Sequence, residues 1–541
     1  MASAIESLPP ELYIAILSYI PPQDLQRTVL SLTRAAPRSP IPAYLIFEYV
    51  RLTHGDQVFQ LYRRLRKSPE DAERVRHFTL ECWIVDADVV VNLIALLHRM
   101  KEMTLFIGPN FAPEHLEDMF QKPKEGLKLI SLRFRPYVQR ATYYQFLKGA
   151  YFDSTLIAFS RWPAADLPTL SIVQDPLDPS IAPTKFAQPL VFFRLDPLST
   201  LACSPFLEDL RHFRLRVPAR QAARFLYALP NALPRVELLD MSTCNVLESD
   251  VEGMLGRFGC LRALVLDGCY IVSQRAVADG QDAEEALGHW AALGKMMALA
   301  GAKYAREREK RLKLWIEASR ERAAAAQAGE EAVQEQAPAP RRARRGRRGL
   351  ATATISLRDS PPKDPVPLPK LPAGATAGRN LLNQRIRILP SLPALRSLAT
   401  TPPASVGPDK HDTIRAEFAR GWSEGIAQLC AVRARLRTSW GNGVRIVRID
   451  PDYEADEEDG DGEDGLAGLM DVEDERAFVI KTQAPENPDE NAERGSDKES
   501  EMLGIDDGSC PVLCLAGPGR KEGHVDGCGH QLGWEVWHDE I

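Results

Sequence analysis

Five residues with metal-binding chemistry lie close together near the end of the sequence: Cys510, Cys514, His524, Cys528 and His530. Thiolate sulfur and imidazole nitrogen are the usual ligands of tetrahedral zinc, and the short spacings here could supply four of them. The spacing differs, however, from that of a standard zinc finger. We therefore expect buried or free thiols, with no metal or other cofactor. Zinc held by Cys510, Cys514, His524 and Cys528, with His530 beside them, is the alternative.

A block of arginines between residues 338 and 349 is the second chemically distinctive stretch. Such a dense positive patch must be solvated and attracts phosphates or a nuclear import receptor. No aromatic residues are interleaved with it, which argues against a dedicated nucleic-acid platform. The sequence favours nuclear localisation over non-specific nucleic-acid contact or a plain charged linker. The residues concerned are Arg341, Arg342, Arg344, Arg345, Arg347 and Arg348.

Signatures of catalysis are weak in this sequence. It contains no phosphate-cradling Gly-Lys-Ser/Thr loop and no His-Glu-x-x-His pair. The acidic run 452–464 lacks the glycine and glutamate positions that a calcium-binding EF-hand requires, so a solvated loop is the better interpretation. We expect a protein that acts by binding rather than as an enzyme.

The composition places the chain among soluble globular proteins. With 541 residues, of which 44% are hydrophobic, it is long enough for two to four domains. The net charge of −7 is small, but the positively and negatively charged residues are separated into blocks. The sequence contains nine cysteines and shows no segment typical of a secretory leader. No apolar run reaches transmembrane length. We expect an intracellular protein, in the nucleus, the cytoplasm or both, without a membrane partner.

Two short amphipathic helices are predicted at the N-terminus. Pro9 and Pro10 suit a first helical turn, and Glu11 places a carboxylate at the positive end of the helix dipole. Apolar residues then recur at helical spacing, until Pro21 and Pro22 end this helix and begin another. A pair of helices this small cannot bury its own apolar faces, so it requires a partner.

This stretch resembles the F-box, the motif through which substrate receptors dock onto the Skp1 subunit of SCF ubiquitin ligases. The resemblance covers about the first fifty residues. It implies binding of Skp1 and, through Skp1, association with cullin and RING subunits. An ordinary helical hairpin packed on its own domain is the alternative. The matching residues are Leu8, Pro9, Glu11, Leu12, Ile16, Leu17, Ile20, Pro21, Asp24 and Leu25.

Short apolar strands then recur along the chain, most of them roughly 23 to 27 residues apart, which is the period of a leucine-rich repeat. A helical stretch lies between several of them. Cys244 and Cys269 follow the last two strands at equal spacing, where a buried side chain can bond loop backbone. A generic α/β domain is the alternative. The predicted strands are Phe78–Leu80, Met103–Leu105, Ile130–Leu132, Leu156–Ala158, Leu170–Ile172, Val191–Phe193, Phe213–Leu215, Leu239–Met241 and Leu264–Leu266.

In a repeat array the strands line one long surface that is suited to a protein ligand. Side chains that alternate outward from the predicted strands are therefore candidates for contact with a protein substrate, although a solvated charged face is the better interpretation of any one of them taken singly. These candidates are Glu81, Arg133, Arg135, Arg214, Arg216, Asp240 and Asp267.

The overall prediction is an α/β protein: a small helical F-box followed by an irregular leucine-rich-repeat-like solenoid with long disordered inserts. A long helix is expected to cap the last repeat, and the C-terminal segments, expected as strands, to fold back onto the array. The expected segments are 1–53 for the F-box, 54–272 for the repeats, 273–336 for the long helix, 337–409 for a disordered basic and proline-rich linker, 410–450 for a helix and a strand, 451–475 for an acidic loop, and 476–541 for C-terminal strands.

These features together favour a substrate-recognition adaptor of an SCF-type ubiquitin ligase. The F-box would hold Skp1, the repeats would hold an unknown protein substrate, and positioning rather than chemistry would be the contribution of this chain. The alternative is a nuclear scaffold or nucleic-acid-associated repeat protein without a role in ubiquitin transfer. Its weakness is that the repeats carry no basic surface comparable to the arginine block, so nucleic acid is an improbable partner.

Overall fold

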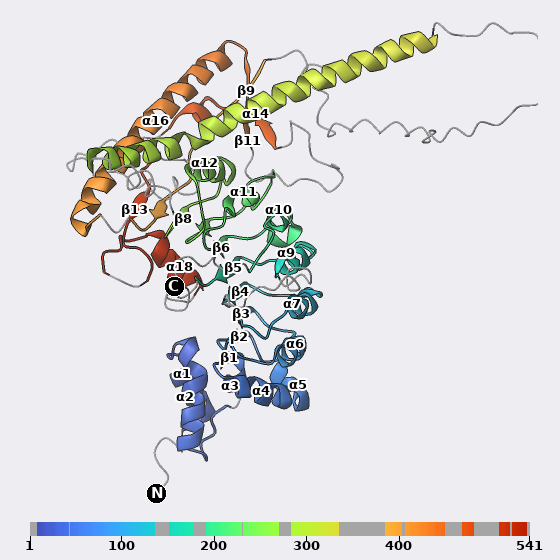
Figure 1. Ribbon diagram of the computed structural model, residues 1–541, viewed down its shortest axis with the longest axis vertical. Helices are drawn as coiled ribbons and strands as arrows, with labels where there is room; N and C mark the ends of the chain where they lie inside the picture. Colours follow the sequence, from blue (N-terminus) through green and yellow to red (C-terminus); the bar gives the residue numbers. More distant parts are fainter. Residues whose placement is uncertain are drawn as a thin grey trace, which may run out of the picture. The chain divides into compact units, whose positions relative to one another are not determined.

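The computed structural model describes two compact units that mix helices and strands (Figure 1), which confirms the α/β class. The first unit comprises Met1–Tyr304, Ser391–Val432 and Val479–Ile541, and the second comprises Ala305–Pro390 and Arg433–Phe478. The described residues are 8–42, 44–135, 151–176, 191–229, 231–269, 283–334, 385–402, 406–449, 468–480, 508–519 and 522–537.

The first unit is built on a ten-stranded sheet in which every neighbouring pair of strands is parallel. The order of the strands in the sheet follows their order in the chain. Its strands are β1 (Tyr49–Leu52), β2 (His77–Leu80), β3 (Glu102–Ile107), β4 (Leu129–Phe134), β5 (Thr169–Gln174), β6 (His212–Arg216), β7 (Leu238–Asp240), β8 (Ala263–Val265), β10 (Ser397–Ala399) and β13 (Val512–Cys514).

One row of apolar side chains runs through all ten strands in register, and we call it the apolar ladder. Each member is the register partner of the next and each is buried, at most 4% exposed. The row forms because every strand places an apolar residue at the same position, and neighbouring strands are stacked less than 5 Å apart. Its members are Val50, Phe78, Met103, Ile130, Leu170, Phe213, Leu239, Leu264, Leu398 and Leu513.

Helices between the strands line one face of this sheet, and α18 lies on the other side of the strands (Figure 1). The helix face encloses the main hydrophobic core. Beyond the helices, two 3-10 turns occur at Pro205–Leu207 and Pro408–Lys410. The helices are α1 (Pro10–Leu17), α2 (Pro22–Ala35), α3 (Leu45–Glu48), α4 (Gly55–Lys67), α5 (Pro69–Ala72), α6 (Ala87–Leu96), α7 (Pro113–Phe120), α9 (Asp153–Ser160), α10 (Pro197–Ala202), α11 (Ala223–Leu226), α12 (Glu248–Arg257) and α18 (Gly529–Trp537).

Seven of the nine predicted strands coincide with β2 to β8, and two predictions are wrong. Leu156–Ala158 lies in helix α9, where Leu156 and Phe159 are buried three residues apart, a helical rather than an alternating pattern. Val191–Phe193 lies in the irregular stretch before α10. A short apolar run has no period of its own, so it cannot distinguish a strand from a buried helix or loop.

The two regularly spaced cysteines bond loop backbone as predicted. The Cys244 thiol donates to the Leu215 carbonyl oxygen at 3.3 Å and accepts from the Val217 N–H at 3.3 Å. The Cys269 thiol donates to the Met241 carbonyl oxygen at 3.3 Å. Burial raises the pKa of Cys244 to about 12, so this thiol stays protonated and can donate.

Two long helices were predicted and both are present: α14 (Ala283–Gln334) and α16 (His411–Gly441). Within the first unit they approach each other through glycines. A Cβ atom on Gly421 would lie 1.8 Å from the Ala291 carbonyl oxygen, and one on Gly294 would lie 2.3 Å from the Phe418 carbonyl oxygen. Only glycine permits such a close contact of two backbones.

Gly421 and Gly425 also delimit a Gly-x-Ser-x-Gly sequence, the spacing of a serine hydrolase nucleophile motif. That motif requires a sharp turn between a strand and a helix. Here the segment lies inside helix α16, where the Ser423 hydroxyl donates to the Ala419 carbonyl oxygen at 2.9 Å. The two glycines therefore serve helix packing.

The second unit contains a three-stranded sheet in the order β12-β11-β9. Strand β9 (Ile386–Ile388) pairs parallel with β11 (Arg445–Ile449), and β12 (Leu469–Asp471) pairs antiparallel with it. Side chains of Leu312, Ile386, Ile388 and Val447 form its core.

Three predictions for the C-terminal half are wrong. Segment 337–409, expected to be disordered, contains β9 and β10, because its alternating apolar residues outweigh its proline content; its residues 337–384 and 403–405 lie outside the described part. The segment 476–541 was expected to form strands, but it begins within a 3-10 turn, Glu475–Phe478, and only Val512–Cys514 (β13) is a strand among its described residues. The alternating sequence Leu532–Trp537 forms the end of helix α18, where Gly533 and Trp537 are buried at helical spacing.

In the part of the chain that the structure describes, none of the helices combines the length and the apolar character needed to cross a membrane.

Replacing Gly421 by alanine tests the helix contact. We expect the free energy of unfolding to fall by about 1–3 kcal/mol, because the new methyl group forces α14 and α16 apart. Urea denaturation followed by circular dichroism measures the change. The matched control is Gly288→Ala in α14, where nothing lies within 4 Å of the new Cβ. Alanine there should leave stability unchanged or raise it by up to about 1 kcal/mol; equal losses in both variants would contradict the close packing.

Candidate functional site

The face of the sheet opposite the helices carries polar and aromatic side chains. Along β3, Met103, Leu105 and Ile107 are buried in the core, whereas the alternate side chains are partly exposed. We call the exposed part, on β1 to β4 and the residues that follow them, the open face. It comprises Arg51, His77, Thr79, Glu81, Trp83, Glu102, Thr104, Phe106, Arg133 and Arg135.

Aromatic rings and guanidinium groups stack at one end of the open face. The Trp83 and Phe106 rings lie 4.6 Å apart, with Arg133 5.2 Å above Phe106 and Arg135 5.5 Å above Trp83. Asp175 accepts from Arg133 Nε at 2.7 Å, whereas no carboxylate among the described residues pairs with Arg135. Rigid aromatic and arginine side chains of this kind are enriched where proteins bind one another.

Glu81, by contrast, is already paired on this face. Its Oε2 accepts hydrogen bonds from Arg51 Nε at 2.9 Å and Nη2 at 2.7 Å. Beside this pair, His77 Nδ1 lies 2.7 Å from Glu102 Oε2 and its ring stacks on Tyr49 at 4.2 Å. The structure therefore keeps Glu81, Arg133 and Arg135 accessible, as a candidate binding surface requires.

The other four predicted substrate contacts are buried, so that part of the prediction is wrong. Arg214, Arg216, Asp240 and Asp267 are each at most 8% exposed. The reason is helix α18, which packs across β7, β8 and β10 and covers this end of the same sheet face. Sequence periodicity could not reveal the covering helix, because α18 is more than 260 residues away from β7 and β8.

These buried polar groups bond one another. Arg216 donates to both carboxylate oxygens of Asp240, with Nη2–Oδ2 at 2.6 Å, and Ser242 donates to Asp240 through its N–H and its hydroxyl. Arg214 donates to the Ser171 hydroxyl at 2.8 Å and lies 4.7 Å from the Trp537 ring. Burial raises the pKa of Asp240, but Arg216, Arg214 and Ser242 outweigh that effect and hold it below its usual value.

The N-terminal hairpin has a small core of its own. Pro9 has extended backbone angles just before Pro10 opens α1, and Pro22 opens α2, as predicted. Both helices contribute to a cluster formed by Tyr13, Leu17, Leu25, Val29 and Leu45. Leu8 and Ile20 are partly buried against this cluster.

A second set of apolar side chains on the hairpin faces outward. Leu12 is 47% exposed, Ile16 is 52% exposed and Tyr19 is 90% exposed, with Ile14 close by at 39%. Of the predicted docking residues, the structure leaves Pro9, Glu11, Leu12, Ile16, Pro21 and Asp24 exposed, whereas Leu17 and Leu25 are buried. Leu17 and Leu25 therefore support the exposed surface rather than form it.

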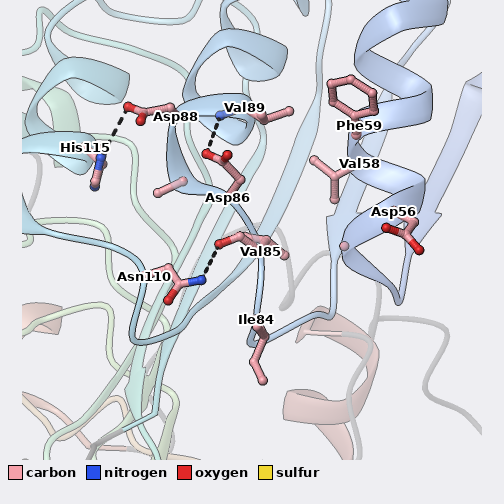
Figure 2. A pocket seen from close by; sticks show the side chains of 12 residues that line it. Asp56, Val58, Phe59, Ile84, Val85, Asp86, Asp88, Val89, Asn110 and His115 are labelled. Atoms are coloured by element: carbon pink, nitrogen blue, oxygen red, sulfur yellow. Dashed lines mark hydrogen bonds and ion pairs between the residues drawn. The ribbon is translucent and has the colours of Figure 1, made fainter.

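A pocket of about 580 Å³ lies beside the first turns of α4 and α6 (Figure 2). Its polar side chains serve the local backbone: Asp86 accepts from the Val89 N–H at 3.3 Å and Asn110 donates to the Val85 carbonyl oxygen at 2.9 Å. Asp88 lies 3.5 Å from His115 Nε2. Asp86 and Asn110 therefore serve to cap a helix and to fix a loop.

The metal-ligand candidates separate into two groups. Cys514, His524 and Cys528 lie together, and they are joined by His530. Cys510 is outside this group, exposed, and bonds the Pro511 carbonyl oxygen. The arginine block Arg341–Arg348 and the acidic run 452–464 lie outside the described residues.

Comparison of the chain with known protein families and with curated proteins finds no family model and no curated protein that matches. Function therefore has to be argued from the residues and their geometry. Sequence patterns did not point to Trp83, Phe106 and Asp175, which contact Arg133 and Arg135. For Trp83 and Phe106 the available signal was their spacing of two residues from the outward-facing positions Glu81 and Thr104. Asp175 lies two residues after Val173, the register partner of Arg133, so that only the strand pairing brings it to Arg133.

Replacing Asp240 by alanine leaves Arg216 buried without its carboxylate. We expect a loss of about 3–5 kcal/mol in the free energy of unfolding, measured by urea denaturation. The matched control is Asp209→Ala, which removes the carboxylate from the exposed ion pair with Arg235 and should cost less than about 1 kcal/mol. If both variants lost the same small amount, Asp240 would not be a buried structural group.

Stability should also depend on pH through Asp240. Because its folded-state pKa is lowered, its contribution is present above the unfolded value of about 3.9 and is lost as the pH falls through the folded-state pKa. Asp240→Asn cannot ionise, so its stability deficit relative to the unmodified protein should be largest near neutrality and shrink below about pH 4. Urea titrations at several pH values measure this difference, and a deficit that stays constant would contradict the lowered pKa.

Proposed function

We propose that this protein is a substrate-recognition adaptor of an SCF-type ubiquitin ligase. The N-terminal hairpin binds Skp1, and the open face binds a protein substrate. The observation that carries the proposal is the division of the hairpin into an inner apolar core and an outer apolar surface, formed by Leu12, Ile16 and Tyr19.

Leu12 and Ile16 are one helical turn apart, so they share a face of α1, while Tyr13 and Leu17 share the side that enters the hairpin core. A helix that is apolar on both sides is normally buried on both. Only the inner side of α1 is covered within the described residues, and the outer side corresponds to the residues that resemble the F-box. Skp1 is the partner that this resemblance implies.

The parallel sheet supports the second half of the proposal. Each strand from β2 to β4 is followed by a helix on the same face, and each strand adds one member to the apolar ladder. We propose that these units form a leucine-rich-repeat-like solenoid, in which each unit buries its apolar side chains against its neighbours. The open face is then the surface for the substrate.

In this scheme the chain contributes position rather than catalysis. Skp1 would connect it to cullin and RING subunits, which bring the ubiquitin-charged conjugating enzyme close to the bound substrate. Holding two reactants together raises their effective concentration strongly, so no catalytic group is required of the adaptor itself. We propose that it acts in the nucleus, the cytoplasm or both, with the arginine block Arg341–Arg348 as the import signal.

The test is binding of purified full-length protein to Skp1, measured by isothermal titration calorimetry. We expect the double variant Leu12→Asp/Ile16→Asp to bind at least about 100-fold more weakly, because two apolar side chains lose their burial and two charges are introduced. Both side chains are exposed, so the unfolding temperature should stay within about 2 °C of the unmodified protein.

The matched control is Phe59→Asp/Leu314→Asp, which places the same charges at exposed apolar positions on α4 and α14. This variant should bind Skp1 normally. Absence of binding by the unmodified protein, or equal binding by the hairpin variant, would contradict the adaptor function and leave a scaffold as the better interpretation.

A further inference from the structure

Four side chains with metal-ligand chemistry converge near the C-terminus, and their ligand atoms all lie within 4.8 Å of one another. The Sγ atoms of Cys514 and Cys528 lie 3.5 Å and 3.7 Å from Nδ1 of His524. In a tetrahedral zinc site with bonds of about 2.0–2.3 Å, neighbouring ligand atoms are separated by about 3.3–3.8 Å. These two distances match that separation.

Both histidines are oriented by a hydrogen bond at the ring nitrogen that points away from the cluster. Nε2 of His524 lies 2.9 Å from the Gly519 carbonyl oxygen, which can only accept, so this nitrogen carries the proton and Nδ1 is left as a lone-pair donor. Nε2 of His530 lies 2.7 Å from Asp267 Oδ2. A histidine held by a carbonyl or carboxylate on its far side is the usual arrangement of a metal ligand.

His530 supplies a second, independent indication that the cluster binds a metal ion. Its side chain is 4% exposed, and its buried Nδ1 atom makes no hydrogen bond of good geometry among the described residues, although the Cys514 sulfur lies beside the ring. A buried polar atom without a partner costs free energy, so such atoms are rare in native proteins. A cation at the centre of the cluster would give this nitrogen its missing partner.

Two sulfur atoms complete the cluster. Cys514 and Cys528 are both buried and unoxidised, and Cys528 immediately precedes the first turn of α18. The N–H groups of Gln531 and His530 are directed at the Cys528 sulfur.

We infer that Cys514, His524, Cys528 and His530 bind one zinc ion in a closed tetrahedral site with a structural role. Two thiolates and two imidazoles match zinc better than the oxygen-preferring Mg²⁺ or Ca²⁺, and four protein ligands leave no open position for catalysis. The site ties the end of β13 to the start of α18.

The Asp267–His530 bond extends this connection to the turn after β8. The ion would therefore hold the C-terminal segment on the sheet, with α18 over Arg214, Arg216 and Asp240. This inference does not depend on Skp1 binding, because it concerns a different part of the molecule.

The test is the zinc content of purified full-length protein, measured by inductively coupled plasma mass spectrometry after incubation with Zn²⁺ and removal of the excess. We expect about one zinc ion per chain. The variant His524→Ala, whose side chain is only half-buried, and the variant Cys528→Ala should each lose at least about three quarters of it. Cys510→Ser is the matched control, since this cysteine lies outside the cluster, and it should retain the full content.

Two further readouts keep the inference falsifiable if a variant folds poorly. Substitution of Co²⁺ into the unmodified protein should give the visible bands of a tetrahedral site together with a sulfur-to-metal charge-transfer band, and a strong chelator should lower the unfolding temperature by at least about 5 °C. Zinc below about 0.1 per chain in the unmodified protein, full zinc in Cys528→Ala, or a Cys514–Cys528 disulfide as the native state would each overturn it.

Discussion

The in-register apolar ladder from Val50 to Leu513 is the constraint on which the rest of the first unit depends. A shift of a strand by one residue would move its ladder side chain to the opposite face. In β2, for example, it would bring His77 or Thr79 into the core in place of Phe78. The ladder therefore fixes the register of all ten strands together. It also explains why β10 and β13, which come from distant segments, join the same sheet: Leu398 and Leu513 continue the row.

The register then determines what lies on the opposite face. Arg214 and Asp240 are register partners there, but they are covered by α18, whose Trp537 lies against Arg214. At the N-terminal end the same face carries Trp83, Phe106, Arg133 and Arg135 without such a cover among the described residues. One sheet face is thus divided into a closed part that stabilises the fold and an open part that is available to a partner.

The sequence was sufficient to predict elements whose stability is local, and insufficient for contacts between distant segments. The strands β2 to β8 were predictable because each carries two apolar residues separated by one position, and the starts of α1 and α2 because proline marks them. Arg216 and Asp240 were predicted to lie on the surface, because no feature of the sequence near them indicates that α18 covers them. Likewise the sequence identified the Cys and His residues as candidate metal ligands. That His530 rather than Cys510 belongs to the cluster depends on its hydrogen bond with Asp267, which is 263 positions away.

The central claim is that the outer side of α1 docks Skp1 while the sheet stays available to a substrate. Hydrogen–deuterium exchange of the full-length protein, with and without Skp1, tests it most directly. We expect slower exchange on Skp1 binding within Leu8–Leu25, with little change in peptides from β2 to β8. Protection of the open face around Trp83 and Arg135 instead, with none in the hairpin, would contradict it.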